Sequence, residues 1–157
     1  MDLAMATRSS GASALESHLG YWLRLVSNQV SQAFSDKLKA QDVSVAEWVV
    51  LRQLYDSEQA PSTLAERIGL TRGAVTKIAD RLIAKSLITR TAGKEDARSQ
   101  VLALARQGRA LVPKLADLAD ANDAAFFSHL APKEREMIEE TMRDIVRRMG
   151  LRGQPVD

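Results

Sequence analysis

The sequence predicts a mainly α-helical fold with one small β-hairpin. Apolar residues recur every three or four positions over long stretches at both ends of the 157-residue chain, which indicates amphipathic helices. Between these stretches, two shorter helical patterns meet at Gly69. The apolar spacing then changes to two over residues 88–92 and 100–105, as expected of two strands. The predicted order is four helices, a hairpin and two more helices.

A long helix is expected at residues 14–39, after a flexible N-terminal tail at residues 1–13 that has no apolar periodicity. At about 1.5 Å per residue this helix would be about 39 Å long, more than a small core needs. Its apolar stripe therefore calls for a partner surface. The stripe consists of Leu15, Leu19, Trp22, Val26, Val30, Ala33, Phe34 and Leu38.

A second helix is expected from Ser44, which with Glu47 forms a capping box, to about Tyr55. Two short helices joined by a tight turn then occupy residues 61–86. Gly69 permits the sharp turn and Thr71 can cap the second of the two helices. This is the plan of a helix-turn-helix. Its small core would be filled by Leu64, Ile68, Leu70, Val75 and Ile78.

The hydrophilic stretch at residues 93–99 joins the two predicted strands and has no core to serve, so we interpret the hairpin as a wing. Helices follow at residues 107–130 and from Pro132 onward. Methionine and isoleucine residues on one side of the last helix fit packing. We expect a winged helix-turn-helix lobe at residues 44–105, a helical dimerisation region at residues 14–43 and 106–150, and a frayed C-terminal tail at residues 151–157.

Composition excludes several classes of protein. The absence of cysteine excludes disulfides, thiolate zinc sites and cysteine nucleophiles. There is neither a secretory signal nor a run of roughly 18 apolar residues, so we expect a soluble, cytoplasmic protein. No phosphate loop, Ser/His/Asp arrangement or positioned acid pair is present, and we expect no enzyme and no cofactor. We also expect no metal, although His18 and His129 of two subunits could combine with acidic ligands.

Positive charge is concentrated in the middle of the sequence. The whole chain has a net charge of +2, whereas residues 61–105 contain eight basic and four acidic residues and carry +4, which leaves −2 for the rest. A basic segment on an otherwise neutral chain is typical of a module that binds a polyanion. An ordinary surface of mixed charge could show the same distribution.

These patterns together predict a protein that binds duplex DNA. Arg72 is the first candidate to meet a base edge in the major groove, followed by Thr76 and Lys77. Ser62 and Thr63 stand at a helix N-terminus, where unpaired N–H groups favour phosphate. The full expected set of DNA-contacting residues is Ser62, Thr63, Thr71, Arg72, Gly73, Thr76, Lys77, Arg81, Arg90, Lys94, Asp96 and Arg98.

The wing carries the most distinctive part of this prediction. Arg98 is placed to enter a minor groove, where narrow A·T-rich segments attract guanidinium groups. Asp96 would orient Arg98 through a charge-assisted hydrogen bond. Lys94 and Arg90 would contact phosphates.

The run LTRGAVTKIADRLIAKSLITR, the DAR tripeptide followed by Ser99, and the run LALARQGRAL resemble the MarR family of winged helix-turn-helix regulators. The resemblance covers roughly residues 15–149. It implies an obligate homodimer built from the first and last two helices, with two winged lobes on a pseudo-palindromic operator. It also implies a ligand pocket between the dimer region and the DNA lobes, from which a small phenolic or aromatic anion would release the DNA.

The chain departs from the family pattern at Ser86, Ala105 and Ala131, where the family commonly has a glycine, a threonine cap and a polar cap. Each change should cost about 1 kcal/mol or less of local stability. For a ligand, the candidate residues are His18, Trp22, Trp48 and Arg52, of which His18 and Trp22 would share one helix face. The two tryptophans could equally be packing residues.

The leading hypothesis is therefore a homodimeric, ligand-responsive repressor or activator of transcription. A different class is an adaptor that keeps the winged fold and binds another protein instead of DNA. The basic residues on the surface that would face DNA argue against the adaptor. A small enzyme is the third hypothesis, for which the sequence offers no nucleophile with its base.

Overall fold

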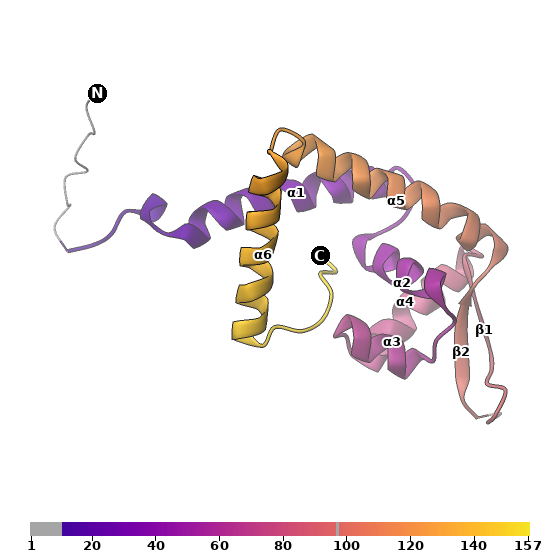
Figure 1. Ribbon diagram of the computed structural model, residues 1–157. Helices are drawn as coiled ribbons and strands as arrows, with labels where there is room; N and C mark the ends of the chain where they lie inside the picture. Colours follow the sequence, from indigo (N-terminus) through magenta and orange to yellow (C-terminus); the bar gives the residue numbers. More distant parts are fainter. Residues whose placement is uncertain (1–10, 97) are drawn as a thin grey trace.

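The computed structural model describes residues 11–96 and 98–157, and most of the expected N-terminal tail lies outside these ranges. It confirms the predicted fold class: six α-helices and one antiparallel hairpin follow in the expected order (Figure 1). A short 3-10 helix precedes them at Leu15–Ser17. The elements are α1 (Leu19–Lys39), α2 (Val45–Asp56), α3 (Pro61–Ile68), α4 (Arg72–Ala84), β1 (Ile88–Ala92), β2 (Gln100–Leu104), α5 (Arg106–Phe127) and α6 (Pro132–Met149).

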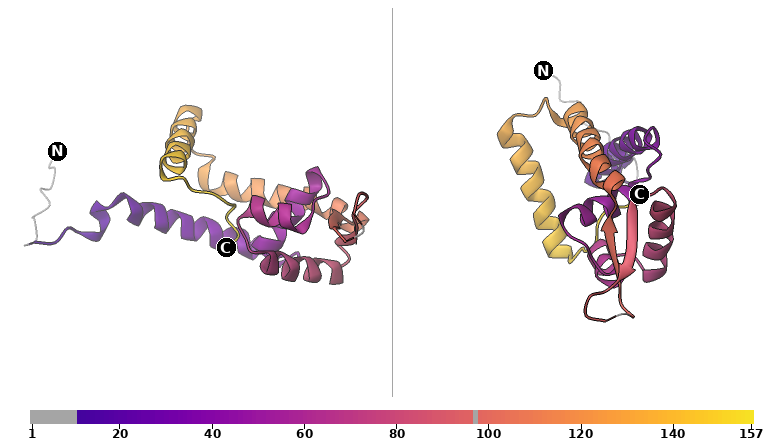
Figure 2. Two further views of the ribbon diagram at one scale, coloured as in Figure 1. Left: turned by 90° about the horizontal axis from the view of Figure 1, so that it is seen from below. Right: turned by 90° about the vertical axis from the view of Figure 1, so that its right-hand side faces the viewer.

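The molecule consists of a compact lobe and protruding helices. Helices α2, α3 and α4 form the lobe together with the hairpin, while α1 and α5 run along one side of it (Figures 1 and 2). In the hairpin Ile88 pairs with Leu104 and Ala92 with Gln100, so the loop at its tip projects away from the helices. Helix α6 leaves the end of α5 and stands apart from the lobe (Figure 2).

A single apolar cluster holds the lobe together and fixes α4 and the wing relative to each other. It draws on the C-terminal end of α1, on α2 to α4, on β2 and on the first half of α5. Each fully buried side chain of this size contributes about 1.5–3 kcal/mol. The largest members are Leu38, Leu51, Leu54, Leu64, Ile68, Leu82, Leu102 and Leu115.

The first helix is shorter than expected. The chain is extended at His18, with φ −96° and ψ 127°, so α1 begins at Leu19 and the predicted single helix from residue 14 is wrong. His18 and Trp22 therefore do not share a helix face. Instead the Trp22 indole Nε1 donates to the Glu16 carbonyl oxygen at 2.9 Å, which closes the break.

Large apolar side chains remain exposed on the first half of α1 and along α6. Within residues 11–96 and 98–157 no other element buries either set, and exposed apolar faces of this kind often mark an interaction site. The exposed residues are Leu15, Leu19, Trp22, Leu23, Leu25, Val26, Met137, Ile138, Met142, Ile145, Val146 and Met149.

The α5–α6 corner is held by an ion pair between Arg135 and Asp123, with Nη1 and Oδ2 2.9 Å apart. The hydrogen bond that Arg135 donates to the Asp123 carboxylate, and then the charge of that carboxylate, raise the pKa of the Arg135 guanidinium. Ala131 is the N-cap residue before α6 and has no side-chain acceptor, but the Glu134 carboxylate accepts the Ala131 N–H at 2.9 Å. This replaces half of the missing cap.

The structure also shows the other two positions at which the chain departs from the family pattern. Ser86 adopts a left-handed conformation, φ 61°, which favours glycine. Ala105 is the N-cap residue before α5 and makes no side-chain cap hydrogen bond.

The C-terminal tail is not frayed, contrary to the prediction. Val156 packs half-buried against the core cluster. The Gln154 N–H donates to the Ile68 carbonyl oxygen at 2.8 Å, so the chain after α6 returns to the lobe (Figure 1). In the part of the chain that the structure describes, no helix is long and apolar enough to cross a membrane.

Candidate nucleic-acid interface

The turn between α3 and α4 sets where α4 begins. Gly69 ends α3 with φ 83°, and its N–H donates to the Ala65 carbonyl oxygen at 2.8 Å. Thr71 then caps α4, because its hydroxyl accepts the Ala74 N–H at 3.1 Å. The predicted cap at Thr71 is confirmed. Its hydroxyl is thereby engaged inside the protein.

Helix α4 has one buried and one exposed face. Val75, Ile78, Ala79 and Leu82 are buried in the lobe. The side chains of Arg72, Thr76 and Lys77 point outward with Gly73 between them. A Cβ at Gly73 would meet no atom within 4 Å, so this glycine has no packing reason inside the chain and leaves room for a partner to approach.

A groove of about 350 Å³ lies between α3, α4 and the wing. It brings together five of the residues expected to contact DNA, although they come from separate parts of the sequence. Ser62 comes from the N-terminus of α3, where an anion would meet free N–H groups. The five residues are Ser62, Arg72, Thr76, Arg90 and Arg98.

Two of the other expected residues flank this region. Thr63 is exposed one position beyond Ser62 on α3, and Lys94 is exposed in the loop of the wing. In the described part of the chain, no ion pair involves Arg72, Lys77, Lys94 or Arg98. These four cations are therefore available to an external anion.

Arg90 differs from this group because it already has an acidic partner. Its Nη2 lies 2.9 Å from Oδ1 of Asp80 on α4, and its side chain is 28% exposed. Its Nε is buried without a hydrogen-bond partner. The ion pair thus joins β1 to α4. It also neutralises part of the Arg90 charge, which leaves Arg90 less suited to bind a phosphate than the unpaired cations.

Arg81 points away from the groove. Its Nε lies 3.6 Å from Oε1 of Glu47, a carboxylate on α2 whose side chain is only 5% exposed. The Lys85 ammonium lies 2.9 Å from Oε2 of the same carboxylate and donates to the Asp42 carbonyl oxygen at 2.6 Å. The structure thus ties the C-terminal end of α4 to α2.

Sequence reasoning identified Glu47 only as half of a capping box, which the structure confirms: Oε2 accepts the Ser44 N–H at 3.3 Å, and the Ser44 hydroxyl accepts the Glu47 N–H at 3.1 Å. The ion pairs to α4 span more than thirty residues, and no local pattern reveals them.

Hydrogen bonds between side chains and the backbone shape the tip of the wing. Asp96 Oδ1 accepts the backbone N–H of Arg98 at 2.9 Å, not its guanidinium group as expected. The Ser99 hydroxyl donates to the Asp96 carbonyl oxygen at 2.7 Å. A Cβ on Gly93 would clash with the Ser99 side chain, so the loop closes tightly there. Asp96 therefore shapes the loop that presents Arg98.

The four candidate ligand residues do not form one site. Trp48 packs edge-on against Phe34, with ring centroids 6.4 Å apart, beside the core. This contact favours packing over a pocket role for Trp48. Arg52 is paired with Asp56 at 3.0 Å and lies over the Tyr55 ring, which Arg109 approaches as well.

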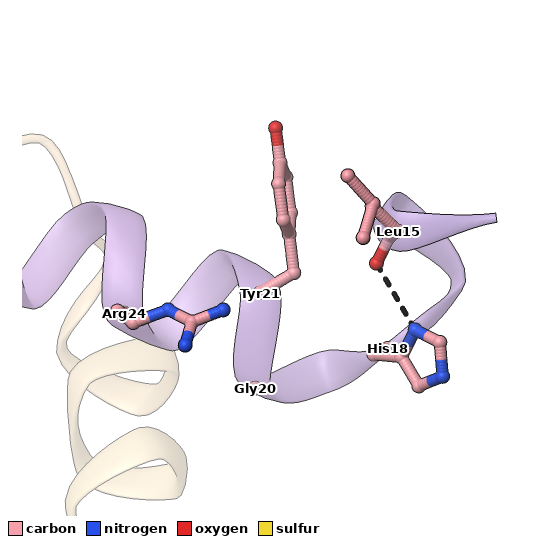
Figure 3. Close-up of a pocket in the computed structure, with 5 residues that line it drawn as sticks. All are labelled: Leu15, His18, Gly20, Tyr21 and Arg24. Atoms are coloured by element: carbon pink, nitrogen blue, oxygen red, sulfur yellow. Dashed lines mark hydrogen bonds between the residues drawn. The ribbon is translucent and has the colours of Figure 1, made fainter.

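His18 belongs to a different place, at the start of α1. It lines an open pocket of about 260 Å³ with Leu15, Gly20, Tyr21 and Arg24 (Figure 3). Its Nδ1 lies 3.2 Å from the Leu15 carbonyl oxygen. Trp22 is 50% exposed and is not among these residues.

The chain resembles known proteins in sequence and in fold. Residues 43–100 match the family model described as MarR family. An uncharacterized HTH-type transcriptional regulator from Bacillus cereus is 29% identical over 128 residues, which are 79% of this chain and 85% of that protein.

Two solved structures share the fold. A mutant of MarR from E. coli, complexed with operator DNA, has a TM-score of 0.73 and 21% identity, and the match covers 82% of this chain and 93% of that chain. BpsR from Bordetella bronchiseptica, whose DNA binding is regulated by 6-hydroxynicotinic acid, has a TM-score of 0.74 and 24% identity, with 86% and 97% covered.

Proposed function

We propose that this chain, whose residues 43–100 match the MarR family model, is a homodimeric, ligand-responsive repressor that binds a pseudo-palindromic operator. Helix α4 would enter the major groove and the wing the minor groove of each half-site. The observation that carries the proposal is the groove in which Ser62, Arg72, Thr76 and Arg98 meet.

The position of each side chain indicates which part of the DNA it would contact. Arg72 stands in the first turn of α4 and is suited to a bidentate contact with a guanine edge. Lys77 is exposed one turn further along, where a phosphate contact is favoured. Arg98, at the tip of the wing, would insert into a narrow minor groove.

Dimerisation is supported by the exposed apolar faces of α1 and α6. A second copy of the chain supplies the same faces and would cover both through a two-fold axis. Two lobes related in this way would place their recognition helices about 34 Å apart, one turn of DNA.

The effector is proposed to be a small aromatic acid. Support comes from BpsR, whose DNA binding responds to such a compound. The pocket at the start of α1 offers the Arg24 guanidinium for a carboxylate and the His18 and Tyr21 rings for stacking (Figure 3). It lies next to exposed apolar side chains of α1, so a second copy could close its open side.

The test uses duplexes that the chain itself selects from a random-sequence pool. Arg72→Ala should weaken binding by about 1–3 kcal/mol and relax the preference at one base pair of each half-site. Lys133→Ala is the matched control, because it removes one exposed positive charge at the α5–α6 corner. Equal affinities for the two variants would contradict the proposal, and a chain that selects no duplex would favour the adaptor.

A further inference from the structure

The tail after α6 contacts the turn of the helix-turn-helix. Helix α6 ends with Gly150 in the left-handed conformation, and the chain then runs back to the lobe (Figures 1 and 2). There the Gln154 N–H donates to the Ile68 carbonyl oxygen at 2.8 Å. Ile68 is the last residue of α3, and a helix leaves its final carbonyl groups without partners inside the helix. The tail satisfies one of them.

Two glycines make this contact possible. Gly69 has φ +83° and Gly153 has φ +94°, conformations that other residues rarely adopt. A Cβ on Gly69 would lie 2.9 Å from the Gly153 Cα, and a Cβ on Gly153 would lie 3.0 Å from the Ile68 carbonyl oxygen. The two backbones therefore touch where a side chain on either would push them apart. Val156 adds a half-buried contact with the core.

The position of this contact links two parts of the molecule. Gly69 lies two residues before Thr71, which caps α4. On the other side, Gly153 lies four residues after the end of α6, a distance that the chain spans with at most about 14 Å at about 3.6 Å per residue. The tail is thus a short connection between α6 and the start of the recognition helix.

We propose that Gly153, Gln154 and Val156 form a strap that positions the recognition helix relative to α6 and thereby sets the spacing of half-sites that the dimer accepts. This role rests on the proposed function, because the spacing of half-sites matters only for a dimer bound to DNA. One added base pair moves the half-sites apart by about 3.4 Å and rotates them around the duplex. A lobe held by the strap cannot follow this change, whereas a lobe held only by α1 and α5 can.

The test compares a duplex selected by the full chain with versions that have one base pair added or removed between the half-sites. The full chain should lose affinity about tenfold or more on the altered duplexes, as misplaced half-sites forfeit contacts of one lobe. A chain that ends at Arg152 should lose less than about threefold. Its affinity for the original duplex should fall only about threefold to tenfold, the size of one hydrogen bond and one partly buried valine.

Point variants separate the strap from a general effect of shortening. Gln154→Pro removes the donated N–H and should behave like the shortened chain. Gln154→Ala keeps the N–H and should behave like the full chain. If the shortened chain and Gln154→Pro penalise altered spacing as strongly as the full chain does, the strap does not position the helix. A single cooperative melting transition and an unchanged dimer mass show that the variants are folded.

Hydrogen exchange tests the contact without DNA. The Gln154 amide should exchange slowly in the full chain and rapidly in Gly153→Ala, which strains the backbone at φ +94°. Rapid exchange in the full chain would overturn the strap even if DNA binding is intact. A chain that selects no duplex would overturn the proposed function, and the spacing role with it, while slow exchange would still establish the contact.

Discussion

The winged lobe and the protruding helices differ in how much of their apolar surface is buried within one chain. The lobe buries a continuous apolar cluster, and its exposed face is polar and basic. The first half of α1 and the whole of α6 show the opposite: they bury almost nothing and expose eleven large apolar side chains. A single chain thus buries the core of its winged lobe and leaves the apolar faces of these helices uncovered, as expected of the dimer proposed above.

The largest expected effect concerns the core of the lobe. Leu54→Ala should lower the free energy of unfolding by about 2–5 kcal/mol, because Leu54 is fully buried and its truncation leaves a cavity. Urea denaturation followed by circular dichroism measures the change. The control is Lys133→Ala, at an exposed side chain outside both the core cluster and the exposed apolar faces. Similar losses for both variants would contradict the role of Leu54 in the core.

Helix α6 provides the converse test. Ile145→Asp places a charge in the exposed apolar stripe and should weaken dimerisation about a hundredfold or more, since an unpaired charge would be buried in the interface. Sedimentation equilibrium gives the dissociation constant. Arg143→Asp, which changes charge outside this stripe, should leave the dimer intact. A dimer that withstands Ile145→Asp would mean that another surface joins the subunits.

The wing allows a smaller change to be predicted. Lys94 is exposed in the loop and should contact a phosphate, so Lys94→Ala should lower the salt slope of DNA binding by about one per chain. Arg98→Ala should instead flatten the preference for A·T pairs beside the half-sites. Binding isotherms at several salt concentrations, with A·T-rich and G·C-rich flanks, measure both. Unchanged slopes for Lys94→Ala would argue against its phosphate role.

The smallest expected effect lies at the junction of α4 and β1. Ser86 has φ 61°, and Ser86→Gly should raise the free energy of unfolding by about 0.5–1 kcal/mol by relieving strain. Thermal melting measures it, with Ser99→Gly as a control in the wing. A decrease in stability would show that the serine side chain compensates for its conformation.

The sequence predicted the features that depend on neighbouring residues. The caps at Ser44 and Thr71, the turn at Gly69 and the hairpin are local patterns, and the structure has them all. The break at His18 was missed because its extended backbone has no proline, glycine or capping side chain to signal it.

The remaining differences concern contacts between distant segments. The pairing of Glu47 with Lys85 and Arg81, which turns Arg81 away from the groove, joins α2 to α4 across the lobe. The tail contact joins Gln154 to Ile68 through a backbone N–H, which every residue except proline has. Neither of these contacts produces a periodic pattern in the sequence from which it could be predicted.

The central claim is that DNA is bound by a dimer, in which each winged lobe has its own buried core and the exposed apolar faces of α1 and α6 form the interface. Footprinting on a duplex selected by the chain tests this most directly, combined with the mass of the complex. We expect two chains per duplex and a two-fold symmetric protected region, with two major-groove contacts centred about 34 Å apart. One chain per duplex, or a single asymmetric protected site, would contradict the claim.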